Sequence, residues 1–218
     1  MRFTIMWDFD GTIADTTDLI IESYQQTFKH FFGFEYPREK ILSVFSLPMR
    51  ESFIALGFEE DIIDRMLNYY RQYHESVFSS RIKAYPGARE IIEELSKEGV
   101  VQAIVTSRRR RTTYEGIQLL KIAEFIQEVV CSEDVIRTKP DPEPIEKVLE
   151  RTNADKKTSF MIGDSQYDQM AAKQANIKFL GALWGPRPES LYPDKNSFLI
   201  SDFKEVKNYV FCYNDKIL

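Results

Sequence analysis

Residues 3–12, FTIMWDFDGT, constrain the fold more than any other stretch, because an apolar run passes directly into two aspartates and a glycine. A short continuous apolar run such as Phe3–Trp7 is typical of a buried strand, and Gly11 indicates a turn at its end. Asp8 and Asp10 would then lie at the carboxyl end of a central strand, where open α/β sheets bind ligands. Carboxylates this close repel each other unless a cation or a shared proton compensates them. Turn chemistry before a helix is the alternative, but it explains only one aspartate.

The chain after residue 84 alternates between apolar runs and segments with helical spacing. Strands are predicted at 100–105, 128–131, 159–162, 177–183 and 198–200, and helices at 87–95, 114–120, 142–151, 166–175 and 203–211. Continuous apolar runs, rather than alternating polarity, favour a parallel sheet that is covered on both faces. The sequence therefore predicts an α/β fold with a doubly wound parallel sheet.

The stretch between residues 15 and 82 has no convincing strand and shows helical periodicity instead. Helices are predicted at 19–31, which Gly33 closes, at 39–45 and at 62–77. We therefore predict a core domain of residues 1–15 and 84–218, with an all-helical domain of residues 16–83 inserted after the first strand. The aromatic residues of this insert either form its own small core or add a wall that faces the active cleft.

Composition narrows the class of protein. The 218 residues carry a net charge of −5 that is spread along the chain, which argues against nucleic acid as a partner. Cys131 and Cys212 are too few for a disulfide framework or a thiolate metal site, which favours a reducing, intracellular setting. We see neither a signal peptide nor an apolar run long enough for a bilayer, so we expect a cytoplasmic protein without a membrane partner. Monomer and dimer both remain open.

Polar side chains follow the predicted strands at the points where they end. They are Asp8 and Asp10 after the first strand, Thr106 and Ser107 after the second, Lys139 beyond the third, and Asp164 and Asp168 after the fourth. Because parallel strands end on the same side, these groups would converge at one edge of the sheet. Each has a plain alternative as a helix cap, a turn residue or a surface charge, but their joint occurrence in this order is hard to explain by chance.

The side chains at these strand ends suit phosphoryl transfer. One carboxylate can accept the phosphoryl group as an aspartyl-phosphate, and a second can protonate the leaving oxygen and then activate water. Mg²⁺ binds carboxylates together with a substrate phosphate. A hydroxyl and an ammonium group could hold the transferring oxygens.

The four segments resemble the motifs of the haloacid dehalogenase-like hydrolases, in the subgroup with a helical cap after the first strand. The matching segments are WDFDGT, VTS, TKPDP and GDSQYD, and the resemblance covers essentially the whole chain. The segment at residues 171–185, AAKQANIKFLGALWG, resembles the phosphoglycolate phosphatase-like and pyrophosphatase-like branch.

This resemblance implies roles for the strand-end residues. It implies that Asp8 is the nucleophile and Asp10 the general acid and base. Mg²⁺ would be held by the carboxylates of Asp8 and Asp164 and by the backbone carbonyl of Asp10. Thr106, Ser107 and Lys139 would bind the phosphoryl oxygens, Asp168 would support the metal site, and Asp15 would belong to the flap that leads into the cap.

Asp10 discriminates between members of the family. A dehalogenase would have no acid there, whereas an alkoxide leaving group requires a proton, so Asp10 favours a phosphatase. The sugar phosphomutases usually carry a histidine on the first cap helix, and none stands near Ser23 and Tyr24. We interpret His30 and His74 as packing or surface residues. A phosphomutase, a pyrophosphatase and a non-catalytic binding protein remain alternatives.

Two arginines are candidates for binding the substrate, and both lie where the chain departs from its branch. The cap loop begins with Ser46 where glycine is common, and Arg108–Arg111 follow the second motif where fewer charges are usual. Arg50 in the cap loop could bind a second anionic group bidentately, or it could be a solvated arginine at a helix start. Arg108 could approach the phosphate, with the other three arginines solvated. We therefore expect a small anionic phosphomonoester as substrate.

Overall fold

The computed structural model describes residues 2–45, 47–185, 192 and 198–212, so Ser46 and the side chain of Cys212 lie outside the described part. The chain forms two compact units. The first comprises Met1–Asp15 and Lys83–Leu218, and the second comprises Thr16–Ile82.

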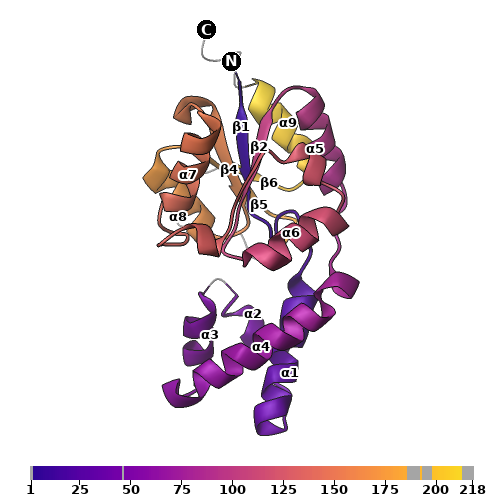
Figure 1. The fold of residues 1–218 in the computed structure, drawn as a ribbon, viewed down its shortest axis with the longest axis vertical. Helices are drawn as coiled ribbons and strands as arrows, with labels where there is room; N and C mark the ends of the chain where they lie inside the picture. Colours follow the sequence, from indigo (N-terminus) through magenta and orange to yellow (C-terminus); the bar gives the residue numbers. More distant parts are fainter. Residues whose placement is uncertain (1, 46, 186–191, 193–197, 213–218) are drawn as a thin grey trace. The chain divides into compact units, whose positions relative to one another are not determined.

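The first unit is built on a six-stranded sheet in the order β3-β2-β1-β4-β5-β6 (Figure 1). Every neighbouring pair is parallel, and β1 lies between β2 and β4 with Trp7 opposite both Ile104 and Ile162. The strands are β1 (Thr4–Trp7), β2 (Val101–Val105), β3 (Glu128–Val130), β4 (Ser159–Gly163), β5 (Lys178–Ala182) and β6 (Phe198–Ile200). The strand order reverses direction at β1, which is the topological switch point of a doubly wound sheet.

Helices cover both faces of this sheet, with α7 and α8 on one side and α5 and α9 on the other (Figure 1). Their bounds are α5 (Ala88–Lys97), α6 (Arg110–Leu119), α7 (Glu143–Thr152), α8 (Gln166–Ala175) and α9 (Phe203–Cys212). Short 3₁₀ helices span η1 (Ala123–Phe125), η2 (Ser132–Asp134) and η3 (Lys156–Thr158). The fold class predicted from the sequence is confirmed.

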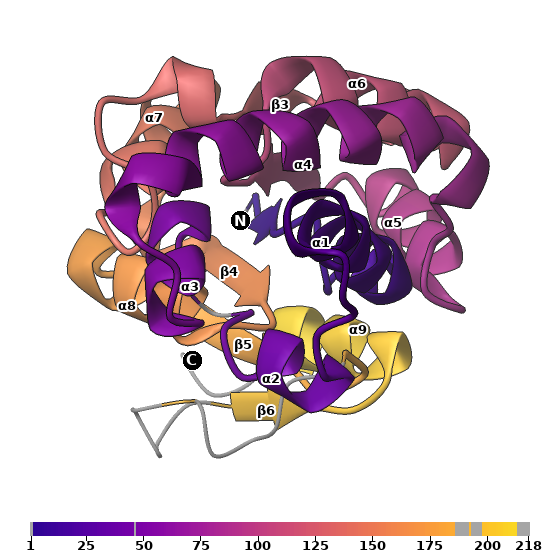
Figure 2. The same ribbon diagram turned by 90° about the horizontal axis from the view of Figure 1, so that it is seen from below.

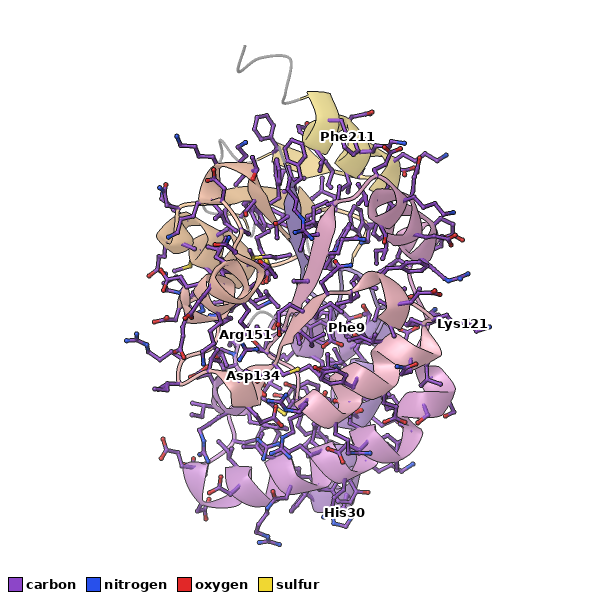
Figure 3. The ribbon with its side chains drawn as sticks, turned by 45° about the horizontal axis from the view of Figure 1, so that its top comes forward. Phe9, His30, Lys121, Asp134, Arg151 and Phe211 are labelled. Carbon is purple, nitrogen blue, oxygen red and sulfur yellow. The ribbon has the colours of Figure 1, made fainter. Side chains whose placement is uncertain are left out.

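The first strand is apolar throughout because both of its faces are buried. Met6 packs in a core cluster with residues of α7 and α8, whereas the ring of Trp7 lies 6.4 Å from that of Phe203 on α9. The indole of Trp7 donates a hydrogen bond to the buried side chain of Gln102 at 3.1 Å. Figure 3 shows how side chains fill the unit, with Phe9 inside it and Lys121 at its edge.

The second unit is entirely helical in its described residues (Figure 2). It contains α1 (Thr17–Phe32), α2 (Arg38–Leu42), α3 (Met49–Ala55) and α4 (Glu60–Arg81). Phe28 and Phe53 are fully buried in its own core cluster, together with Tyr24 and Tyr70. The aromatic residues of the insert therefore form a small core, which was one of the two predicted interpretations.

The two histidines of this unit both pack against neighbours. His74 is buried and its ring nitrogen lies 3.1 Å from the hydroxyl of Ser23, while the ring of His30 stacks on Tyr69 at 4.0 Å. No helix in the described part of the chain combines the length and the apolar character needed to cross a bilayer.

Candidate active site

The carboxylate of Asp8 lies just beyond β1, at the carboxyl edge of the sheet. Its backbone N–H continues the strand ladder by donating to the carbonyl of Ile162 at 2.8 Å. The residue is only 7% exposed, and its Oδ1 accepts a hydrogen bond from the Lys139 ammonium at 2.7 Å. The continued ladder and the buried contact hold this carboxylate in one position.

Lys139 is a buried ammonium with three acceptors. Its Nζ donates to Asp8 Oδ1, to Asp168 Oδ1 at 2.5 Å and to the carbonyl of Val105 at 2.9 Å. Three donors and three acceptors satisfy the ammonium completely. Burial would lower the pKa of Lys139, but the carboxylates of Asp168 and Asp8 raise it above its usual value. Lys139 therefore stays charged and links the segment after β3 to β1 and α8.

Two further carboxylates lie beyond β4. Asp164 follows the strand directly and is 1% exposed, and Asp168 lies in the first turn of α8 and is fully buried. Ser165 caps this helix: its N–H and its hydroxyl donate to Asp168 Oδ2 at 3.1 and 2.5 Å, and its oxygen accepts from the Asp168 N–H at 3.3 Å. This capping box fixes the orientation of the Asp168 carboxylate.

Oxygens of Asp8, Asp164 and Asp168 all lie within 4.8 Å of one another. The three carboxylates are buried together, and the ammonium of Lys139 contacts two of them, those of Asp8 and Asp168. Burial raises the pKa of Asp8, and together with the neighbouring charges of Asp168 and Asp164 it brings this pKa to about 8 against the attraction of Lys139. A hard divalent cation with oxygen ligands would offset the negative charge of these carboxylates and favour the ionised form of Asp8. The residues present therefore fit Mg²⁺.

Asp10 forms a bidentate pair with Arg108. Arg108 donates from Nε to Asp10 Oδ2 at 2.9 Å and from Nη2 to Asp10 Oδ1 at 2.7 Å. The Arg108 side chain is 7% exposed and that of Asp10 is 25% exposed. Both carboxylate oxygens of Asp10 are thus held by one guanidinium group.

The other predicted binding residues are placed differently from one another. Thr106 is buried at the end of β2, where its Oγ1 accepts from the backbone N–H of Arg108 at 3.1 Å, whereas Ser107 is exposed. Arg50 lies in the helical unit, where it forms an ion pair with Asp64. The structure therefore brings Asp8, Asp164 and Asp168 together, with Lys139 in contact with Asp8 and Asp168, and pairs Asp10 with Arg108.

Sequence reasoning missed two supporting groups, Ser165 and Trp184. Ser165 could have been found, because Ser-x-x-Asp before a helix predicts a capping box. The indole of Trp184 donates to the carbonyl of Thr12 at 2.9 Å, and no local pattern signals that contact. Gly11, which the sequence marks as a turn residue, is also required sterically, since a Cβ there would lie 2.1 Å from Asp164 Oδ2.

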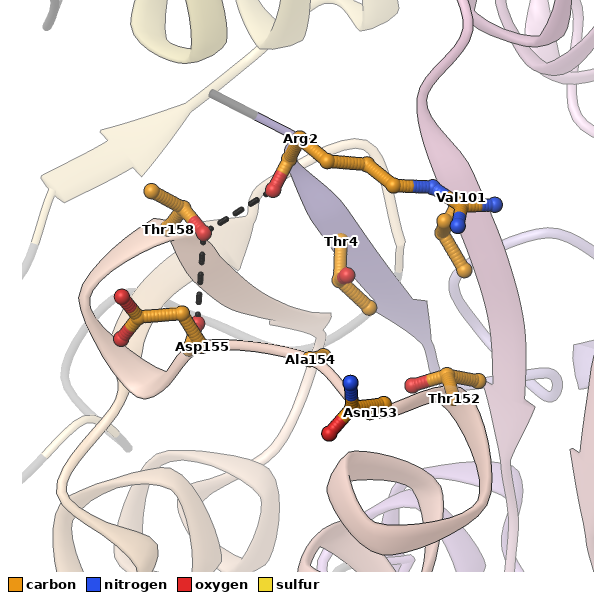
Figure 4. Close-up of a pocket in the computed structure, with 8 residues that line it drawn as sticks. All are labelled: Arg2, Thr4, Val101, Thr152, Asn153, Ala154, Asp155 and Thr158. Atoms are coloured by element: carbon orange, nitrogen blue, oxygen red, sulfur yellow. Dashed lines mark hydrogen bonds between the residues drawn. The ribbon is translucent and has the colours of Figure 1, made fainter.

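A cavity of about 170 Å³ lies at the opposite edge of the sheet (Figure 4). Thr4 and Val101 at the amino ends of β1 and β2 line it, together with Asp155 and Thr158. None of the predicted site residues is among its lining residues, so this cavity is separate from the carboxylate cluster.

A family model, two curated relatives and a solved structure each match most of this chain. The family model of haloacid dehalogenase-like hydrolases matches residues 5–182. Pyrophosphatase PpaX from Anoxybacillus flavithermus is 35% identical over 181 residues, which cover 83% of each chain. Pyrophosphatase PpaX from Bacillus velezensis is 36% identical over 180 residues, covering 83% of this chain and 82% of the relative. The structure of a haloacid dehalogenase-like family hydrolase from Streptococcus pneumoniae has a TM-score of 0.86 at 23% identity and covers 95% of this chain and 98% of its own.

Proposed function

This chain belongs to the haloacid dehalogenase-like hydrolases, and on that premise we propose that it is a Mg²⁺-dependent phosphatase that acts on a small anionic phosphate compound. The observation that most supports the proposal is the buried Asp8 carboxylate, held by Lys139 beside Asp164 and Asp168. A buried carboxylate in one fixed orientation can act as a nucleophile toward a phosphoryl group.

In the first step, an Asp8 carboxylate oxygen attacks phosphorus, and the bond from phosphorus to the leaving oxygen breaks. Asp10 gives a proton to that oxygen, so the leaving group departs as a neutral hydroxyl compound or a protonated phosphate. The Thr106 hydroxyl binds a transferring oxygen, and the positive charge of the nearby Lys139 ammonium, which holds Asp8, stabilises the negative charge of the transferring group. The product of this step is an aspartyl-phosphate on Asp8.

In the second step, Asp10 takes a proton from water while the water oxygen attacks phosphorus. The bond from phosphorus to the Asp8 oxygen breaks, which releases inorganic phosphate and restores the carboxylate. Mg²⁺, when bound by the carboxylates of Asp8 and Asp164 and the Asp10 carbonyl, offsets the charge that carboxylates and phosphate bring together. Asp168 holds Lys139 in place throughout, through its contact at 2.5 Å.

Two substrate classes follow from this proposal. The relatives that carry the name pyrophosphatase favour inorganic pyrophosphate as the first compound to test. A phosphoglycolate-like monoester is the second, because the pattern near residues 171–185 resembles that branch as well. The assignment of residues 16–83 as a cap, the contact of Arg50 with substrate, the cytoplasmic location and the oligomeric state stay predictions.

Phosphate release from pyrophosphate, phosphoglycolate, nucleoside monophosphates and sugar phosphates, with and without Mg²⁺, tests the function. We expect Asp8→Asn to abolish Mg²⁺-dependent release, since an amide is a poor nucleophile. Asp61→Asn is the matched control, because Asp61 is exposed in the first turn of α4. Substantial activity in Asp8→Asn would contradict the nucleophile assignment. Interconversion of sugar phosphate isomers without phosphate release would favour a phosphomutase.

A further inference from the structure

The bidentate pair between Arg108 and Asp10 is a contact that the proposed chemistry does not explain. Its two hydrogen bonds measure 2.9 and 2.7 Å and occupy both oxygens of the carboxylate. The guanidinium also lies over the ring of Phe9, 5.9 Å from its centroid, and the Arg108 side chain is 7% exposed. A guanidinium in this position is shielded from solvent and selective for a planar or tetrahedral anion.

The backbone of Arg108 is fixed while its side chain retains rotatable bonds. Its N–H donates to Thr106 Oγ1 at 3.1 Å, and its carbonyl accepts from the N–H of Ser132 at 3.1 Å. Arg108 therefore stands between Thr106, which would bind transferring oxygens, and Asp10, which would face the leaving oxygen. Its guanidinium is thereby placed on the leaving-group side of the substrate.

The other arginines of the run have different partners at the surface. Arg110 pairs with Asp134 at 2.5 Å, and Arg111 lies 3.8 Å from Glu115, with side chains that are 51% and 61% exposed. Arg109 is the exposed residue that precedes α6. Arg108 alone among the four places its guanidinium against Asp10.

We propose that Arg108 is a specificity-determining residue that exchanges Asp10 for an anionic group on the leaving side of the substrate. The inference rests on the proposed function and names its substrate class: compounds whose leaving group is itself an anion, with diphosphate as the clearest case. Both Asp10 oxygens are occupied by Arg108, so at least one must be released before Asp10 can contact the leaving oxygen. An incoming phosphate replaces the lost partner of the guanidinium, whereas a neutral leaving group does not.

Steady-state kinetics on two substrates test this exchange. Inorganic pyrophosphate carries an anionic leaving group, and glycerol 1-phosphate carries a neutral alcohol. We expect Arg108→Ala to lower kcat/KM for pyrophosphate about 10- to 100-fold more than for glycerol 1-phosphate, the range expected for a charge-assisted bidentate contact. The loss of kcat/KM in Arg108→Lys should lie between those of the unmodified protein and Arg108→Ala, because lysine keeps the positive charge but cannot form two parallel hydrogen bonds to one anion. Arg111→Ala is the matched control and should change both values less than about twofold.

Calorimetry measures the contribution of Arg108 to ligand binding independently of its effect on turnover. Imidodiphosphate is a diphosphate analogue with a P–N–P bridge, and orthophosphate has no second anionic group. With Mg²⁺ present, we expect the unmodified protein and Arg111→Ala to prefer imidodiphosphate and Arg108→Ala to lose that preference. Arg108→Ala should lower the unfolding midpoint, because Asp10 loses both of its hydrogen bonds to the guanidinium, and a midpoint that stays well above the assay temperature shows that the fold is intact.

Two results would overturn the inference. One is an equal loss of kcat/KM for both substrates in Arg108→Ala, with unchanged preference for imidodiphosphate, because Arg108 would then only orient Asp10. The other is an unmodified protein that binds imidodiphosphate no better than orthophosphate. A protein that releases phosphate from no substrate but loses its diphosphate preference in Arg108→Ala would contradict the proposed function and still support the role of Arg108 in binding.

Discussion

At residue 11 the backbone turns sharply beneath the carboxylate cluster, with φ at +81°. A methyl group at this position would lie 2.1 Å from Asp164 Oδ2, far inside van der Waals contact. Gly11 therefore serves two purposes, since it permits the positive φ and leaves room for a carboxylate that we assign to the metal site.

The substitution Gly11→Ala separates these two purposes when it is compared with Gly57→Ala. Gly57 has φ at +92° and open space where a methyl group would lie. Its substitution by alanine therefore costs only the backbone strain of a positive φ, about 1–2 kcal/mol of stability, which Gly11→Ala also incurs. We expect both variants to lose stability in urea denaturation, and Gly11→Ala alone to lose Mg²⁺-dependent phosphate release. Equal activities in the two variants would show that Asp164 can move without consequence.

At the scale of the element, α8 orients Asp168 through its own amino-terminal cap. The side chains of Ser165 and Asp168 each bond to the backbone of the other, and Asp168 in turn contacts Lys139. The capping box at the start of α8 thus also orients Asp168, a residue of the candidate site.

Removing the cap should therefore affect activity as well as stability. We expect Ser165→Ala to cost about 1 kcal/mol of unfolding free energy and to lower kcat, because Asp168 loses the hydroxyl donor that helps to orient it. Asp155→Ala is the control: Asp155 caps η3 by accepting from the N–H of Lys157, and it lies at the opposite edge of the sheet. It should lose comparable stability and keep its kcat. An unchanged kcat in Ser165→Ala would mean that Lys139 and the backbone N–H of residue 165 are enough to hold Asp168.

Sequence patterns predicted some elements closely and others poorly, for physical reasons. The helix at 166–175 and the strand at 198–200 agree with the structure, because apolar spacing or an apolar run marks them. The helix predicted at 114–120 begins at Arg110, since its first turn is polar and has no apolar period to reveal it. The helix predicted at 39–45 ends at Leu42.

The arrangement of the candidate site could likewise be predicted only in part. The convergence of strand-end residues could be predicted, because parallel strands end at one edge. The contact of Arg108 with Asp10 could not, since it joins long side chains across 98 positions and depends on rotamers. The contact of Lys139 with Asp168 was missed for the same reason. The catalytic and binding roles of these residues stay predictions.

At the scale of the whole molecule, the carboxylate cluster links stability to pH and to Mg²⁺. The pKa of Asp8 is raised to about 8, so the metal-free folded state binds a proton that the unfolded chain has released above about pH 4. Stability of the metal-free protein should therefore fall as the pH rises through this window. Mg²⁺ competes with that proton, and its effect should be larger at high pH.

Thermal unfolding with excess Mg²⁺ and with a chelator measures this linkage. We expect Mg²⁺ at 100 times its Kd for pH 8 to add about 2.7 kcal/mol near pH 8, and the same Mg²⁺ concentration to add less near pH 6, where the proton on Asp8 weakens binding. Asp164→Asn should remove most of the gain, whereas Asp202→Asn, at an exposed position before α9, should keep it. A gain that does not depend on pH would contradict the raised pKa of Asp8.

The two compact units have separate hydrophobic cores, and both tryptophans, Trp7 and Trp184, lie in the first unit. Phe53 is fully buried in the core of the second unit, so Phe53→Ala should cost about 3–5 kcal/mol there. We expect circular dichroism to detect early loss of helix while tryptophan fluorescence keeps its original midpoint. Phe160→Ala in the first unit should shift the fluorescence instead. Coincident transitions in Phe53→Ala would show that the units unfold together.

The chain leaves and re-enters the first unit at adjoining backbone positions. The N–H of Asp15 donates to the carbonyl of Lys83 at 2.9 Å, and Ala14 and Ala84 form an antiparallel bridge. Closing so small a gap demands little loop entropy, which makes the junction a natural splice point. A shorter turn, or an unrelated module with adjacent ends, could be grafted between these positions without interrupting any strand of the sheet. In evolutionary terms, such a scaffold can exchange its insert while the catalytic edge is inherited unchanged.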